Sequence, residues 1–213
     1  MVKEDHLAQS AWTRDIVSIR VTVLNDPYEQ TTMAPAICAG VGVHTGRRVR
    51  LVVRPAAAGQ GIVFVRTDIT DRDNRIPVSG EAVIDARLNT MIANGDDVRL
   101  STIEHLMAAL SAMNISNAVI EVDGPELPIL DGSALPFVQL LDRAGFRRQE
   151  QPRRYIEILK TVHVEEGDKH AALMPCDRFE MRFEIDFPTP VIGNQVIDFV
   201  VDETTYRSEI MSA

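Results

Sequence analysis

The sequence predicts an α+β fold in which helices cover one sheet in a two-layer sandwich. Apolar residues alternate over several short segments, two other segments repeat them at helical spacing, and turn residues separate the segments. In residues 31–150 the order is strands, helix, strand, helix, which is typical of a two-layer unit. After residue 150 the strand pattern begins again, but the helix–strand–helix part of the first unit is not repeated. We therefore predict a complete first domain and a truncated second domain of the same fold.

The composition of the chain indicates which broad class of protein it belongs to. The chain has 213 residues with 45% hydrophobic and 25% charged residues, the mix of an ordinary globular protein. A net charge of −9 without a basic block argues against a nucleic-acid partner. Cys38 and Cys176 match no metal or redox spacing, which favours free thiols in a reducing compartment. No apolar run approaches a transmembrane segment of about 20 residues, and residues 1–15 lack a signal core, so we expect a cytoplasmic protein.

Residues 1–30 are predicted to be an N-terminal extension, although residues 16–24 alternate like a strand. The first domain is predicted to cover residues 31–150 and to be followed by a polar linker at 149–154. Its strands are expected at 37–44, 49–53, 62–65, 81–86 and 118–122.

Two amphipathic helices are expected in the first domain. The first covers residues 101–113, where Ser101 and Glu104 have the spacing of a capping box. Its apolar face repeats at helical spacing. The second helix covers residues 135–144 and ends at Gly145. The apolar positions of the first helix are Ile103, Leu106, Met107 and Leu110.

Residues 151–213 are predicted to form the incomplete second domain. A helix is expected to open at Asp202 and to be too short to cover the sheet. An apolar strand face left uncovered in this way predicts self-association or recruitment of a complementing second half. The expected strands are 156–164, 171–174, 179–187 and 196–201.

Two chemically capable groups lie side by side at the start of the first helix. The imidazole of His105 can bind a metal or carry a proton, and the carboxylate of Glu104 can act as a base. The alternative is that Glu104 only caps the helix and His105 is only a surface histidine. The metalloprotease pattern is excluded because position 109 is alanine rather than a second histidine.

Three stretches together resemble one known family. They are Gly40-Val41-Gly42-Val43-His44-Thr45-Gly46, the segment from Ser101 to Leu110, and Pro125-Glu126-Leu127-Pro128-Ile129-Leu130-Asp131-Gly132-Ser133-Ala134-Leu135-Pro136-Phe137. In this order they closely resemble the UDP-3-O-acyl-N-acetylglucosamine deacetylase family. The resemblance implies a zinc-dependent amide hydrolase of lipid A synthesis that acts on a UDP-linked acylated glucosamine. It also implies two domains of the same α+β fold with the active site between them.

The resemblance assigns roles to four residues. His105 matches a zinc ligand and Glu104 matches the general base. Asp131 lies where the family has an acidic residue near the site, although it equally fits a turn aspartate before glycine. Lys169 matches a substrate-contacting lysine, and a solvated charge on a hairpin is the alternative. For His44 a structural role and a ligand contact remain open.

The family's other two zinc ligands and its histidine general acid follow in an H-K-x-x-D motif and beyond, and this sequence ends before them. A catalytic zinc needs about three protein ligands, so the sequence predicts an incomplete zinc site. The leading hypothesis is a deacetylase in a truncated form. The alternatives are a non-catalytic paralogue that binds a nucleotide-sugar lipid or a partner protein, and a gene fragment with no independent role.

Overall fold

The computed structural model describes residues 16–20 and 27–213, which combine helices and strands in an α+β fold. The described residues divide into two compact units. The first unit comprises residues 27–153 and 206–213, and the second unit comprises residues 16–20 and 154–205.

A five-stranded sheet forms the framework of the first unit. In β4 the valines and leucine at 49, 51 and 53 are buried, and the arginines at 48, 50 and 54 are exposed. Because side chains alternate between the two faces of a strand, the face that carries Val49, Leu51 and Val53 points into the core. The strand order is β3 (Ala36–Val41), β4 (Arg48–Pro55), β10 (Ala118–Val122), β5 (Ile62–Arg66) and β6 (Arg75–Pro77). All neighbours are antiparallel except β10 and β5, which are parallel.

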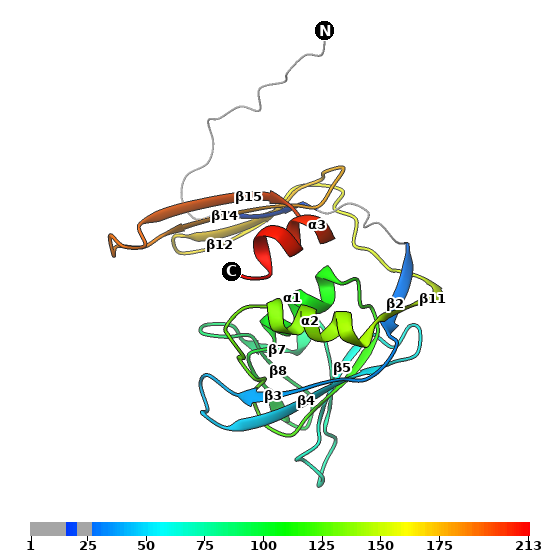
Figure 1. The fold of residues 1–213 in the computed structure, drawn as a ribbon. Helices are drawn as coiled ribbons and strands as arrows, with labels where there is room; N and C mark the ends of the chain where they lie inside the picture. Colours follow the sequence, from blue (N-terminus) through cyan, green and yellow to red (C-terminus); the bar gives the residue numbers. More distant parts are fainter. Residues whose placement is uncertain (1–15, 21–26) are drawn as a thin grey trace. The chain divides into compact units, whose positions relative to one another are not determined.

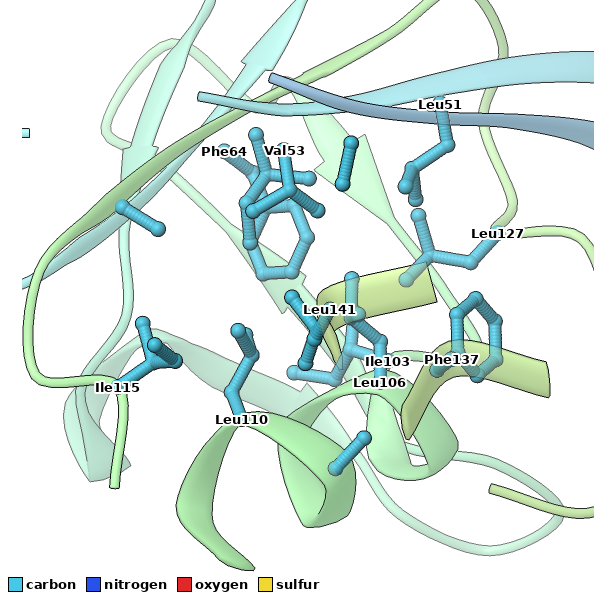
Figure 2. Packing of buried hydrophobic residues seen from close by; sticks show 14 of the residues in the cluster. Leu51, Val53, Phe64, Ile103, Leu106, Leu110, Ile115, Leu127, Phe137 and Leu141 are labelled. Carbon is cyan, nitrogen blue, oxygen red and sulfur yellow. The ribbon is translucent and has the colours of Figure 1, made fainter. Parts of the chain in front are cut away.

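Two helices, α1 (Glu104–Ala112) and α2 (Leu135–Ala144), cover one face of this sheet (Figure 1). Leu106 and Leu110 of α1 are at most 1% exposed, and they share one core cluster with residues of α2 and the sheet (Figure 2). The predicted apolar face of the first helix is therefore confirmed. The predicted end of the second helix is also confirmed, because Gly145 follows α2 with a φ of 71° that suits glycine.

Two smaller sheets complete the first unit. One is β7 (Val83–Asp85), β8 (Met91–Ala93) and β9 (Arg99–Leu100), and the other pairs β2 (Tyr28–Thr32) with β11 (Phe146–Pro152). A short 3-10 helix, η1 (Gly80–Ala82), precedes β7.

The predicted polar linker at 149–154 is wrong for residues 149–152, which belong to β11, although the division between the two units falls within the predicted segment, between residues 153 and 154. Gln149 accepts a hydrogen bond from Asn117 and donates one to the carbonyl of Ala56. The polar side chain of Gln149 therefore serves hydrogen bonds within the first unit.

The second unit contains a five-stranded sheet of order β12 (Val162–Glu166), β13 (Lys169–Leu173), β1 (Ile16–Arg20), β14 (Glu180–Asp186) and β15 (Asn194–Val200). β1 lies in the middle of this sheet, parallel to β13 and antiparallel to β14. This part of the predicted N-terminal extension is thus a central strand. The remainder of the extension up to residue 26 lies outside the described residues.

The C-terminal residues differ from the prediction as well. The helix expected from Asp202 is α3 (Glu203–Thr205) followed by a π-helical segment, η2 (Tyr206–Ile210). Residues 206–213 group with the first unit rather than with the second. The physical reason is that Tyr206 is 6% exposed within the core of the first unit and Arg207 forms a 2.7 Å ion pair with Asp142.

No helix within residues 16–20 and 27–213 has the length and apolar character needed to cross a membrane.

Candidate functional site

Glu104 and His105 are the first two residues of α1, and both are half-buried. The backbone N–H of Thr90, just before β8, donates a 3.1 Å hydrogen bond to Oε2 of Glu104. The positive end of the helix dipole also favours a carboxylate at this position. Glu104 is therefore held at the helix start by a neighbouring loop.

The predicted capping box is wrong. α1 begins at Glu104, and its N-cap position is Ile103, which makes no side-chain capping bond. The backbone N–H of Ser101 donates instead to the carbonyl of Pro125, and its carbonyl accepts from Leu127, at 3.0 and 3.1 Å. Thr102 follows with a φ of 60°, which is unusual for a β-branched residue. Ser101 is thus engaged by the third motif and is unavailable to the helix.

Asp131 lies on a loop before α2 and has an exposed side chain. Its Oδ1 accepts hydrogen bonds of 2.9 Å from both the backbone N–H and the hydroxyl of Ser133. These bonds hold the pKa of Asp131 below its ordinary value, and the positive charge of His105 contributes in the same direction. Asp131 therefore has the geometry of a turn aspartate and also lies near enough to His105 to interact electrostatically. Its role in the reaction stays a prediction.

The other candidate residues belong to other elements of the fold. Lys169 is exposed at the start of β13 in the second unit, opposite Glu166 in a hairpin, so its predicted substrate contact stays a prediction. His44 is exposed, and its backbone N–H donates to Glu126. His163 and His170, for which the motif comparison suggests no role, lie on β12 and β13.

The described part of the chain does not by itself fit a zinc ion. Within residues 16–20 and 27–213 no group of three or more His, Cys, Asp or Glu side chains could hold a metal. Burial raises the pKa of the Cys38 thiol to about 11, which disfavours the thiolate that metals bind. His105 can supply one ligand, and a tetrahedral site would need the others from elsewhere.

Sequence reasoning missed Glu126 as a residue of interest. It is 1% exposed, and its carboxylate accepts hydrogen bonds from the backbone N–H groups of His44 and Thr45 and from the hydroxyl of Thr102. The available signal was its position between prolines and apolar residues in the third motif. A glutamate in such a setting has to find polar partners if it is buried.

Comparison with known proteins agrees with the motifs. The family model described as "UDP-3-O-acyl N-acetylglycosamine deacetylase" (LpxC) matches residues 29–213. The UDP-3-O-acyl-N-acetylglucosamine deacetylase of Phenylobacterium zucineum is 59% identical over 183 residues, which are 86% of this chain and 62% of that protein. The proteins of the same name from Myxococcus xanthus and Syntrophus aciditrophicus are 47% and 42% identical, with 87% of this chain and 59% and 58% of those proteins covered. The chain thus spans about 60% of the length of these curated relatives.

Proposed function

The chain belongs to the UDP-3-O-acyl N-acetylglycosamine deacetylase family, and on that premise we propose that it contributes the base-bearing part of a deacetylase active site. The substrate would be a UDP-linked 3-O-acylated N-acetylglucosamine, and the reaction would be hydrolysis of its acetamide in lipid A synthesis, in the cytoplasm. The observation that carries the proposal is the placement of Glu104 and His105 together at the start of α1, with Glu104 oriented by Thr90.

Glu104 is proposed as the general base. Its carboxylate would take a proton from water as the water oxygen attacks the acetamide carbonyl carbon. The carbon–nitrogen bond then breaks as the nitrogen takes a proton from a general acid, which the family resemblance implies to be a histidine, and the products are acetate and the free amine of the sugar. The N–H of Thr90 leaves the second carboxylate oxygen, Oε1, to receive the proton, because the recorded bond is to Oε2.

His105 is proposed as one ligand of a zinc ion, a role that rests on the family resemblance. A bound zinc ion would polarise the carbonyl and lower the pKa of its water. By the family resemblance the remaining ligands would come from an H-K-x-x-D motif, and no group of three ligating side chains is found among residues 16–20 and 27–213. The hydrogen bonds from Thr90 and Ser133 would keep the carboxylates of Glu104 and Asp131 oriented when such an ion is bound.

The test of the base is Glu104→Gln in the 213-residue chain, combined with the part of the Phenylobacterium zucineum relative that the chain does not cover. Acetate release from the UDP-linked substrate should appear in this mixture. It should fall about 10²–10⁴-fold in the variant, because glutamine keeps the size of glutamate and removes the base. Glu81→Gln, a change of the same kind at an exposed position, is the matched control. Equal rates for Glu104→Gln and Glu81→Gln would contradict the proposal.

Metal binding offers a separate measurement. The chain alone should not retain stoichiometric zinc through dialysis against a mild chelator, because one histidine cannot build a tetrahedral site. Retention of one zinc per chain that disappears in His105→Ala would show that this chain completes the site by itself.

A further inference from the structure

The three motifs of the sequence meet at one carboxylate in the structure. Oε1 of Glu126 accepts from the backbone N–H of His44 at 2.9 Å and from the hydroxyl of Thr102 at 3.2 Å. Oε2 accepts from the backbone N–H of Thr45 at 2.8 Å. The first motif supplies two of these donors, the second supplies one, and Glu126 belongs to the third.

The backbone around this carboxylate is equally constrained. Ser101 and Glu126 form a parallel β-bridge directly before Thr102. On the other side, a Cβ atom added to Gly42 would lie 2.3 Å from Oε2 of Glu126. The absence of a side chain at Gly42 is therefore what lets the first motif approach the carboxylate closely.

Thr102 is the strained residue in this arrangement. It is 4% exposed and has a positive φ, a backbone conformation that a β-branched side chain adopts only when its surroundings hold it. Its hydroxyl donates to Glu126, and Glu104 follows two residues later. The direction in which α1 starts is thus set at a residue that Glu126 restrains.

A role in packing alone does not explain a carboxylate at this position. Removing an ionised group from water is costly, and an apolar side chain of similar volume would fill the space at lower cost. Burial raises the pKa of Glu126, but the hydrogen bonds from His44, Thr45 and Thr102 together outweigh it and hold the pKa below its ordinary value. The group is therefore an acceptor at neutral pH and matches its donors.

We propose that Glu126 is a positioning residue of the candidate site, which fixes the conformation of Thr102 and so the placement of Glu104 and His105, while it orders the backbone at His44 and Thr45. Its link to catalysis rests on the proposed function, whereas the positioning itself does not.

The test is Glu126→Gln in the 213-residue chain, followed by backbone amide and imidazole NMR. Glutamine presents an NH₂ group in place of one accepting oxygen, so exchange of the Thr45 amide should accelerate on the order of 10-fold or more. The decisive reporter is the amide of Thr90, which donates to Glu104 and has no recorded bond to Glu126. Its exchange should also accelerate, and the imidazole signals of His105 should shift.

Thr102 offers a matched pair of variants. Thr102→Val keeps the shape and removes the donor, so it should shift Thr90 and His105 while the Thr45 amide stays protected. Thr102→Ser keeps the hydroxyl and should resemble the unmodified chain. Should Glu126→Gln fail to fold, Thr102→Val alone decides the question, because it leaves both backbone donors on the carboxylate.

A folded Glu126→Gln or Thr102→Val variant with unchanged Thr90 and His105 signals would overturn the proposal and leave Glu126 as a local anchor. In the mixed assay described above, Glu126→Gln should lower kcat on the order of 10–100-fold with a smaller change in KM, because the base is misplaced rather than lost. If the NMR shifts occur but Glu104→Gln does not slow acetate release, the positioning stands and the proposed function fails.

Discussion

In both units apolar residues alternate along the strands, but these residues are buried to different extents. In the first unit, side chains such as Leu51 and Phe64 on the sheet meet α1 and α2 and are fully buried (Figure 2). In the second unit Phe183 stacks on Phe199 with ring centroids 6.2 Å apart, yet Ile185 on the same face of β14 and Phe187 just after the strand remain 42% and 49% exposed. Among residues 27–213, whose burial the structure describes, every buried hydrophobic side chain belongs to the first unit.

This difference shows what alternation in a sequence does and does not establish. Period-2 alternation predicts a strand and the face that its apolar residues share. Burial of that face requires a second layer, and the only helical residues described in the second unit are those of α3. The candidate base Glu104 lies in the unit that holds the buried core.

The largest expected effect tests this contrast directly. Leu106→Ala should cost about 2–5 kcal/mol of unfolding free energy, because Leu106 is fully buried and the substitution leaves a cavity. Leu159→Ala in the second unit is the same chemical change at a residue that is 80% exposed, and it should cost less than about 0.5 kcal/mol. Both are measured by denaturant unfolding of the full chain. Similar losses in the two variants would remove the contrast between the units.

A smaller effect is expected at Gly42, and it tests whether the tight packing of the first unit extends to the first motif, residues 40–46. Gly42→Ala should cost about 1–3 kcal/mol, since the new methyl group would clash with a carboxylate that three hydrogen bonds hold in place. Gly80→Ala is the control, because a Cβ atom there meets no atom within 4 Å. If thermal or chemical unfolding gives the same small change for both variants, the loop at Gly42 yields easily and the packing around Glu126 is loose.

The elements that sequence predicted well are those defined by neighbouring residues. The apolar repeat in residues 103–110 and the closing Gly145 are local signals, and both are confirmed in the structure. The pairing of β2 with β11 depends on residues more than a hundred positions apart, so neither strand had a local signal strong enough to predict it. Polar residues such as Gln149 indicated a linker because their partners were invisible in the sequence.

The candidate site shows the same limit. Glu104 and His105 could be selected because they are adjacent and match a family motif. The restraint of Glu104 by Thr90 and of Thr102 by Glu126 could not be predicted, since each joins segments that meet only after folding. The capping box was wrong for the same reason, because a β-bridge to the third motif outcompetes the local capping bond of Ser101.

The smallest expected effect concerns the C-terminal segment that groups with the first unit. Asp142→Asn removes the ion pair with Arg207 but keeps the size of the side chain. Both partners are partly exposed, so the loss should be only about 0.2–1 kcal/mol near neutral pH. Asp198→Asn is the matched control, since it removes a similar pair with Arg182 in the second unit and should leave unfolding of the first unit unchanged.

The pH dependence makes this small effect specific to Asp142. Its hydrogen bonds with Arg207 hold its pKa in the folded chain below the ordinary value, although burial opposes them. A carboxyl with a lowered folded pKa contributes stability that is present above its unfolded pKa of about 3.9 and is lost as the pH falls through the folded pKa. The difference in unfolding free energy between the unmodified chain and Asp142→Asn should therefore be constant from about pH 5 to 7 and shrink below about pH 4. A difference that is as large in acid as at neutral pH would mean that asparagine disturbs α2 itself, and that the ion pair does not hold residues 206–213 on the first unit.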